Sequence, residues 1–231
     1  MLNKIKQDLQ KLQNEEKAKI LSRFFKTGKG QYGEGDVFLG ITVPDQRKVA
    51  KKYTNINLQY LPNLLSNKIH ENRLIALLIL VEKFNTANEQ NKKDIVNFYL
   101  KNTKYINNWD LVDLSADKIL GAYLLEKDKS ILYKLSKSNN LWERRIAIIS
   151  TFYFIRNNKF EDTLKIAEIL LNDKHDLIQK AVGWMLRELG KRNQNIEEEF
   201  LKKHYKKMPR TMLRYAIERF DENKKEFYLK K

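Results

Sequence analysis

A short apolar pattern recurs along this chain about every 35 residues, and this recurrence constrains the fold more than any other feature. A small or aliphatic residue stands at the centre of each copy, at positions 76, 111, 147, 181 and 216. This period is typical of stacked helix-turn-helix units. Each unit buries its apolar face only against its neighbours, so the pattern predicts a curved α-solenoid. The copies are Arg73-Leu74-Ile75-Ala76-Leu77, Trp109-Asp110-Leu111, Arg145-Ile146-Ala147-Ile148, Gln179-Lys180-Ala181-Val182 and Arg214-Tyr215-Ala216-Ile217.

Helical partners are predicted between these copies. Apolar residues at helical spacing predict an N-terminal pair of helices within residues 1–26. Thr42, or the residue beside it, can cap a further predicted helix that holds Pro44 in its first turn. The segment 69–84 is apolar on almost every side, which favours a buried helix. The other predicted partners are 58–66, 92–100, 130–135, 160–171 and 196–205.

The composition supports one all-α domain. The 231 residues include only eight glycines and three prolines, which favours long helices over many strands and tight turns. We expect a single domain over 1–231, with the N-terminal helices in 1–26, a glycine-rich loop in 27–41, repeats over about 42–220, and a short C-terminal tail.

The chain is strongly basic. Its 45 lysines and arginines exceed its 29 aspartates and glutamates, which gives a formal charge of +16. A globular domain with this excess commonly binds a polyanion, and we expect the repeats to present a concave basic face to duplex DNA. The alternative is a lysine-rich surface that is merely solvated.

Several kinds of site and location are not predicted. The chain has no cysteine, which excludes disulfides and thiolate chemistry, and His70, His175 and His204 match no metal-ligand spacing. We therefore expect neither a metal nor a cofactor. No apolar run approaches the length of a membrane span, and the N-terminus lacks the apolar core of a secretion signal. We expect a monomer in a bacterial-type cytoplasm, used at the nucleoid.

The only glycine-rich stretch spans residues 27–36. It lacks the Gly-Lys-Ser/Thr ending of a nucleotide-binding loop, and no clear strand precedes it. The loop could contact a nucleic-acid backbone through its amides, Lys26 and Lys29. It could equally be a connector.

The repeat register brings chemically useful side chains onto one predicted surface. Trp109 and Asp113 share a helix face because they are four residues apart. Positions equivalent to them in the later units are occupied by Arg145 and by Gly183 beside Trp184. Gly183 costs a helix about 1 kcal/mol relative to Ala, so we expect another part of the structure to approach it closely.

Each of these residues also has a purely structural interpretation. Either tryptophan could be a core residue. Asp113 could be a solvated helix carboxylate, and the same applies to Asp110 and Asp117, which could also be caps. Arg145 could pair with Glu143 or Asp113. The functional interpretation depends on a carboxylate, two indoles and an arginine converging on one face.

At these residues the chain resembles the AlkD-like DNA alkylation repair glycosylases, a family built from HEAT-like repeats. The resemblance covers most of the chain, in the family's order and spacing. It lies in Phe38-Leu39-Gly40-Ile41-Thr42-Val43-Pro44, Trp109-Asp110-Leu111-Val112-Asp113, Trp142-Glu143-Arg144-Arg145-Ile146-Ala147-Ile148 and Gln179-Lys180-Ala181-Val182-Gly183-Trp184-Met185-Leu186-Arg187-Glu188.

The resemblance implies a glycosylase that removes cationic purines alkylated at N3 or N7 from duplex DNA. It implies that Asp113 is the catalytic carboxylate, that Trp109 and Trp184 hold the deoxyribose, and that Arg145 contacts the backbone. Phe24 stands where the family often has a tyrosine, so a hydroxyl is missing there. We expect the other DNA contacts to come from Lys29, Arg187 and Arg214.

The chemistry itself needs few groups. An alkylated purine is cationic and leaves as a neutral base, while the sugar acquires oxocarbenium character. A nearby carboxylate stabilises that charge, and each flanking indole adds on the order of 0.5–2 kcal/mol of cation–π attraction. The resemblance implies that the lesion stays in the base stack.

A second hypothesis is a non-catalytic HEAT-like repeat protein that binds DNA or serves as a scaffold, because a solenoid fold does not decide function. A nuclease or lyase is disfavoured, since neither paired metal-binding carboxylates nor a placed lysine nucleophile is evident.

Overall fold

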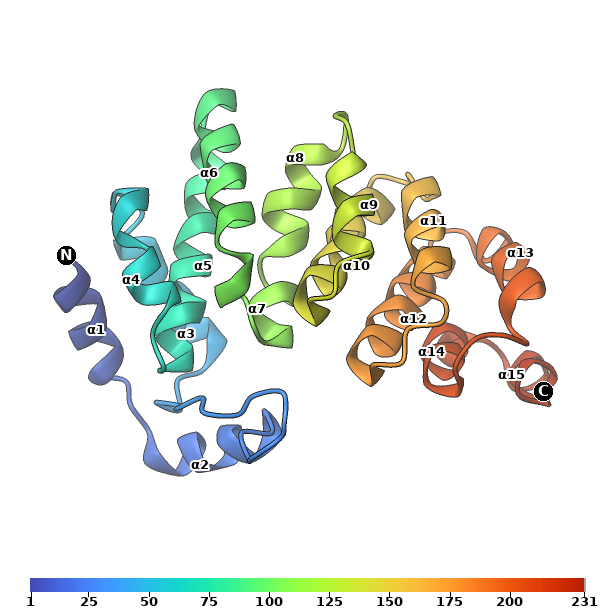
Figure 1. Cartoon of the computed structure of the whole chain (residues 1–231), viewed down its shortest axis with the longest axis horizontal. Coiled ribbons are helices and arrows are strands. Elements are labelled where there is room, and N and C mark those ends of the chain that lie inside the picture. Colours follow the sequence, from blue (N-terminus) through green and yellow to red (C-terminus); the bar gives the residue numbers. More distant parts are fainter. Residues whose placement is uncertain (231) are drawn as a thin grey trace. The chain divides into compact units, whose positions relative to one another are not determined.

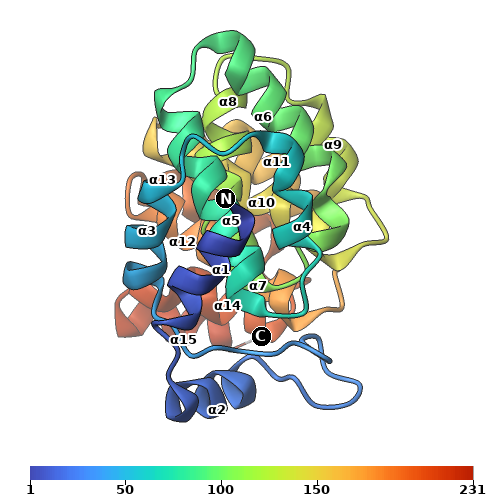
Figure 2. The same cartoon turned by 90° about the vertical axis from the view of Figure 1, so that its left-hand side faces the viewer.

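The structure, a computed structural model, describes residues 1–230. Within this part of the chain the regular elements are all helical, and the nearest approach to a sheet is an isolated bridge between Val37 and Ile69. The fold is therefore all-α, as predicted, and built from helical repeats (Figures 1 and 2). Its contacts cluster into two compact units, unit 1 (Met1–Ser115) and unit 2 (from Ala116 onward).

Unit 1 is built around one long buried helix, α5 (His70–Thr86). Thirteen of its 17 residues are buried, which confirms the prediction from its apolar sequence. It packs against α3, α4, α6 and α7 (Figure 1). The other elements of unit 1 are α1 (Leu2–Gln10), α2 (Glu15–Phe24), α3 (Val43–Lys52), η1 (Leu58–Tyr60), α4 (Pro62–Leu65), α6 (Glu89–Lys101), η2 (Thr103–Tyr105) and α7 (Trp109–Asp113).

The helix starts in unit 1 follow local rules. α1 and α2 form the predicted N-terminal pair. Pro44 lies in the first turn of α3 after Thr42, as predicted, although the Thr42 hydroxyl donates to Asp45 and does not cap a backbone amide. The predicted helix 58–66 is divided into η1 and α4, because Pro62 lacks the amide donor that a continuous helix requires.

Unit 2 repeats one packing scheme along the chain. The buried helix α10 (Leu141–Arg156) packs against α9 (Ser130–Ser136), η3 (Asp117–Gly121) and α12 (Asp176–Gly190), and α12 packs against α14 (Arg210–Ala216). The segment expected as a short tail contains one more helix, α15 (Glu222–Leu229). The remaining elements are α8 (Ala122–Leu124), α11 (Glu161–Ile169), α13 (Gln194–His204) and η4 (Ile217–Arg219).

The five repeat centres confirm the register read from the sequence. Every one lies in a helix and is at most 1% exposed. Four of the five are alanines, whose small side chain lets the neighbouring helix approach. The partner helices also form where predicted, as α6, α9, α11 and α13. The centres are Ala76, Leu111, Ala147, Ala181 and Ala216.

Gly183 meets the close approach that was predicted for it. A Cβ atom at this position would lie 2.4 Å from the carbonyl oxygen of Met212 and 2.5 Å from Cβ of Tyr215. These atoms belong to α14, which packs directly on the glycine. Only a residue without a side chain permits this spacing between α12 and α14.

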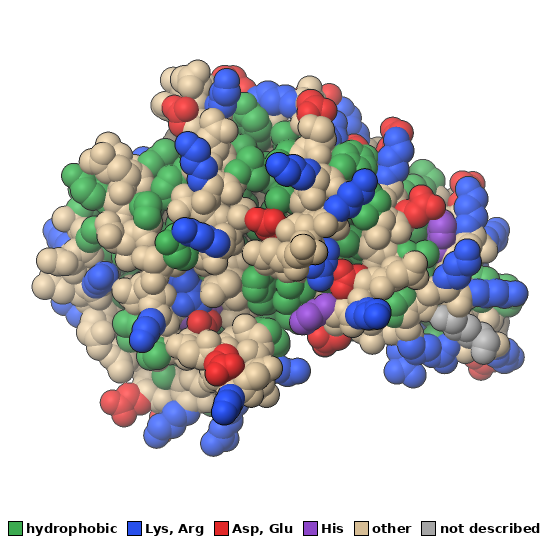
Figure 3. Space-filling view, in the orientation of Figure 1, with side chains coloured by type: hydrophobic (Ala, Val, Ile, Leu, Met, Phe, Trp, Pro, Cys, Tyr) green, Lys and Arg blue, Asp and Glu red, His purple; other side chains and the backbone are tan. Residues whose placement is uncertain are grey.

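Charged side chains are spread over the face of the molecule shown in Figure 3. Lysines and arginines are visible on both units and are interleaved with carboxylates at several points. A concave basic face remains a prediction. Among residues 1–230, no helix is long and apolar enough to cross a bilayer.

Candidate active site

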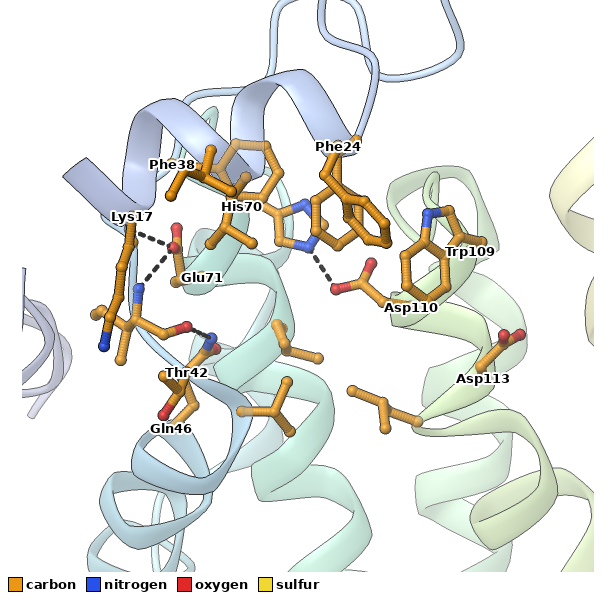
Figure 4. Close-up of a pocket in the computed structure, with 18 residues that line it drawn as sticks. Lys17, Phe24, Phe38, Thr42, Gln46, His70, Glu71, Trp109, Asp110 and Asp113 are labelled. Atoms are coloured by element: carbon orange, nitrogen blue, oxygen red, sulfur yellow. Dashed lines mark hydrogen bonds and ion pairs between the residues drawn. The ribbon is translucent and has the colours of Figure 1, made fainter. Parts of the chain in front are cut away.

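A cavity of about 380 Å³ lies in unit 1 between α2, α3, α5 and α7 (Figure 4). Its wall is mostly aliphatic and aromatic, with Ile20, Leu21, Phe25 and Leu74 among the contributors. An apolar cavity with a few polar groups at its edge is the usual form of a binding site for an organic group. The polar groups here include the carboxylates of α7.

Trp109 and Asp113 both line this cavity, as their four-residue spacing predicted. Trp109 opens α7, and Asn108 caps the helix by accepting a hydrogen bond from the Trp109 amide at 2.8 Å. Asp113 lies one turn further along, at the end of the same helix (Figure 4). Both side chains are half-buried, so each keeps one side accessible.

The Trp109 indole is held between aromatic rings from the end of α2. The Phe25 ring stacks on it at 5.0 Å and 9°, and the Phe24 ring meets it edge-on at 5.8 Å. Phe24 is 61% exposed and also lines the cavity. This position carries no hydroxyl, so Phe24 offers ring contacts alone. Its contact with DNA remains a prediction.

A buried ionic network lies directly behind Trp109. His70 places Nε2 2.7 Å from Asp110 Oδ2 and Nδ1 3.3 Å from Asp36 Oδ2. Arg73 donates to the same Asp36 oxygen at 2.5 Å, and Asn108 contacts it at 3.4 Å. These groups come from three segments that are distant in sequence, so the network is made by tertiary packing.

The network holds His70 in its charged form. Burial lowers the pKa of His70, but the negative charge of Asp110 and hydrogen bonds to Asp110 and Asp36 outweigh burial and raise it to about 9. At neutral pH the imidazole is a cation between two carboxylates. The charge on Asp110 is therefore directed into the protein, toward His70.

The expectation that Asp110 and Asp117 are solvated is wrong. Asp110 is 6% exposed and bonds to His70, and Asp117 is 1% exposed and pairs with Lys118 and Arg156. Asp110 also accepts a hydrogen bond from the Leu111 amide, which is consistent with the capping alternative. A helix carboxylate is buried when a cation faces it, and local spacing does not reveal a cation 40 residues away.

Glu71 fixes the connector that leads from α2 to α3. Its carboxylate accepts hydrogen bonds from the amides of Leu39, Gly40 and Ile41 at 2.8–3.3 Å. Gly40 has a φ of +82°, and a Cβ there would lie 2.1 Å from the Asn14 carbonyl oxygen. The connector is thus locked at both the glycine and the carboxylate, which fixes one wall of the cavity.

At the start of the glycine-rich loop, two backbone amides already donate hydrogen bonds within the loop. The amides of Gly28 and Gly30 donate to Gln31 and Glu34 within the same loop. Lys29 is exposed, and Lys26 lies over the Tyr32 ring. A nucleic-acid contact by this loop would depend mainly on its lysines, and it remains a prediction.

Unit 2 contains the second predicted indole. Trp184 lies on α12, half-buried, and its Nε1 donates to Glu188 at 3.1 Å. The Phe152 ring on α10 is 5.7 Å away. Arg187 pairs with Glu218 and Glu188, and Arg214 is exposed on α14.

Arg145 lies inside unit 2. It is 5% exposed, and its guanidinium donates to the Leu177 carbonyl at 2.5 Å, which ties α10 to the first turn of α12. A contact to a phosphate would require this side chain to turn outward. Trp109 and Asp113 belong to unit 1, whereas Arg145 and Trp184 belong to unit 2. Their convergence on one surface therefore stays a prediction.

Among the described residues, no group of three or more His, Asp or Glu side chains is placed to hold a metal ion. The groups collected at α7 are a half-buried carboxylate, an indole and an apolar cavity. A carboxylate beside an indole face stabilises a cation or a developing positive charge. This is the chemistry that the described cavity offers.

Comparisons with known proteins identify the fold and the family. Two solved structures are similar in fold. A predicted DNA alkylation repair enzyme from Enterococcus faecalis matches with a TM-score of 0.70 and 19% identity, over 91% of this chain and 97% of that one. AlkD2 from Streptococcus mutans matches with a TM-score of 0.58 and 17% identity, over 90% and 99%.

No curated protein matches significantly by sequence. The family model described as "DNA alkylation repair enzyme" matches residues 5–220. The match spans nearly the whole chain, so the protein belongs to the family of DNA alkylation repair enzymes.

Proposed function

We propose that this repair enzyme is a DNA glycosylase that hydrolyses the N-glycosidic bond of cationic N3- or N7-alkylated purines in duplex DNA. The observation that carries the proposal is the placement of Asp113 and Trp109 one turn apart at the edge of the same cavity. Family membership supports the substrate, since alkylation damage is what the family repairs.

Asp113 supplies the negative charge that the reaction needs. As the bond to a cationic base breaks, the base becomes neutral and the sugar becomes positive. A fixed carboxylate stabilises this transition state more than the ground state, which is the condition for catalysis. Asp113 also orients the water that attacks the sugar, or accepts a proton from it.

The indoles provide the second part of the site. Trp109 flanks the sugar, and its position depends on the Phe25 ring behind it. Trp184 serves as the second flank in this proposal. The lesion stays stacked in the duplex, so selectivity comes from the lability of a cationic base. Neutral lesions such as uracil are expected to be poor substrates.

Basic side chains hold the duplex. Lys29, Arg187 and Arg214 contact phosphates, Phe24 packs against the sugar-phosphate backbone, and Arg145 contributes after turning outward. Each phosphate contact releases counterions, so affinity falls steeply as salt rises. We expect a monomer to suffice, because both indoles belong to one chain.

The substitution Asp113→Asn tests the proposal. It keeps the size of the side chain and removes the charge. We expect single-turnover excision from methylated duplex DNA to fall by at least about 100-fold, while the Kd for DNA changes little. Released bases are identified by chromatography. Asp94→Asn, an exposed helix carboxylate of unit 1, is the matched control and should excise normally.

A non-catalytic DNA-binding or scaffold protein is the alternative. It predicts that the unsubstituted protein binds DNA yet releases no base from methylated duplex. Equal rates on a methylated purine and on uracil would instead contradict the proposed dependence on a cationic base.

A further inference from the structure

We propose that His70 is a positioning residue for this site: its buried contact with Asp110 and the ring stack that runs from it to Trp109 hold the indole and Asp113 beside the cavity. The inference rests on the proposed function for its consequence in catalysis. Its structural part concerns unit 1 alone.

The first step is that α7 is too short to hold its own position. It contains five residues, and an isolated helix of this length has negligible stability. Its placement therefore comes from tertiary contacts. Within α7 the buried side chains are Asp110, Leu111 and Val112. Of these three, only Asp110 makes a directional polar contact with another helix.

The second step is the position of Asp110 within α7. It follows Trp109 directly and precedes Asp113 by three residues, so it lies between the two groups of the proposed site. Its contact with His70 joins α7 to the first residue of α5, the most buried helix of unit 1 (Figure 4). A displacement of Asp110 would move both neighbours.

The third step is a second, independent connection from His70 to the same indole. The His70 ring stacks on Phe38 at 4.6 Å, Phe38 stacks on Phe25 at 5.0 Å, and Phe25 stacks on Trp109 at 5.0 Å. His70 thus constrains α7 through its ring face and through its Nε2 atom.

The fourth step concerns charge. The charged groups that face His70 are Asp36 from the loop after α2, Arg73 from α5 itself, and Asp110 from α7. The same segment between α2 and α3 that supplies Asp36 also contributes the Phe25 and Phe38 rings. Loss of the His70 proton would leave the two carboxylates with Arg73 alone, and the contact that holds α7 would weaken.

Substitution of His70 separates positioning from a merely structural role. His70→Phe keeps a ring in the stack and removes the bond to Asp110. We expect single-turnover excision to fall by about 10- to 100-fold, since small displacements of catalytic groups have effects of this size. The Kd for DNA should stay within about 2-fold, and near-native circular dichroism should show that the variant is folded.

His204→Gln is the matched control, because His204 lies in unit 2 with a ring contact to Phe200 and should excise normally. A folded His70→Phe variant that excises at the rate of the unsubstituted protein would overturn the proposal. A variant that only unfolds at lower temperature, with the same rate, would also overturn it.

A second measurement needs no variant of His70. Fluorotryptophan incorporated into the protein reports each indole by 19F NMR, and Trp109→Phe identifies the Trp109 line. We expect this line to shift between pH 8 and 10 with a midpoint near 9, as His70 loses its proton. A Trp109 line that does not move over this range overturns the proposal. This measurement remains possible if His70→Phe fails to fold.

Failure of the His70 proposal can be distinguished from failure of the proposed function. An unsubstituted protein that releases no base would refute the glycosylase proposal. The Trp109 line would still show whether His70 positions α7.

Discussion

Trp109 and Trp184 are both half-buried helix residues, yet they are held in different ways. The neighbours of Trp109 come from segments 24–25 and 108, and behind these lies the His70 network. Trp184 bonds to Glu188, one turn away on its own helix, and contacts Phe152 on α10. Trp109 is thus placed by several layers of tertiary contacts, whereas Trp184 has one bond within its own helix and one ring contact with the neighbouring helix.

This difference predicts where unit 1 is sensitive. We expect removal of a group of the His70 network to change the position of Trp109 indirectly. Trp184 instead depends on the packing of α12 against α10 and α14. Proteins commonly fix catalytic groups by a supporting layer of hydrogen bonds. The three predictions below test the contrast, in order of decreasing size.

The largest expected effect is on stability as a function of pH. The folded-state pKa of His70 is about 9, above its unfolded value of 6.5. The stabilisation is therefore complete below pH 6.5 and is lost as pH rises through 9. A difference of this size corresponds to about 3 kcal/mol at most. Urea unfolding between pH 6 and 10 measures it, and Asp110→Asn should flatten the curve.

The contribution of Glu197, in unit 2, to the pH dependence of stability must be eliminated before that of His70 is measured. It is 2% exposed, and burial raises its pKa to about 8, so its ionisation also costs stability as pH rises, between about 4.5 and 8. Glu197→Gln serves as the background for the titration of His70. A curve that stays flat between pH 6.5 and 9 in this background would contradict the role of His70.

The next effect concerns the packing beneath Trp184. Gly183→Ala introduces a Cβ that overlaps backbone of α14, so α12 and α14 must separate. Overpacking of this kind destabilises a protein by roughly 1–3 kcal/mol. The higher helix propensity of Ala offsets about 1 kcal/mol of this loss. We expect a net loss of up to about 2 kcal/mol in the free energy of unfolding.

Lys180→Ala on the same helix is the control, since this lysine pairs with Asp176 near the surface. It should change stability by less than about 0.5 kcal/mol. A Gly183→Ala variant as stable as the unsubstituted protein would mean that α14 can move away from the added Cβ at little cost in free energy.

The smallest effect is expected at Glu188. Glu188→Gln keeps an acceptor for the Trp184 Nε1 and removes the pairs with Lys191 and Arg187. Partly exposed surface pairs of this kind contribute about 0–1 kcal/mol. Both the free energy of unfolding and the Trp184 19F line should change little. A large shift of that line would show that Trp184 is also held by a charge network.

Much of the fold could be predicted from the sequence because it depends on local periodicity. The five repeat centres are buried helix residues, the partner helices form where expected, and Gly183 packs against a neighbouring helix. The family suggested by the motifs around Trp109, Trp142 and Trp184 is confirmed over residues 5–220. The pairing of Trp109 with Asp113 at one cavity also follows from helical spacing.

The parts that were missed all depend on contacts between distant segments. The sequence by itself determined the all-α class, the repeat register and the family. Each depends on the spacing of particular residues along one helix or between successive helices. Only the tertiary structure showed that Asp110 is buried against His70, that Phe25 stacks on Trp109, and that Arg145 lies inside unit 2. The reason is physical: a charged side chain is buried only where a partner meets it, and that partner is chosen by packing.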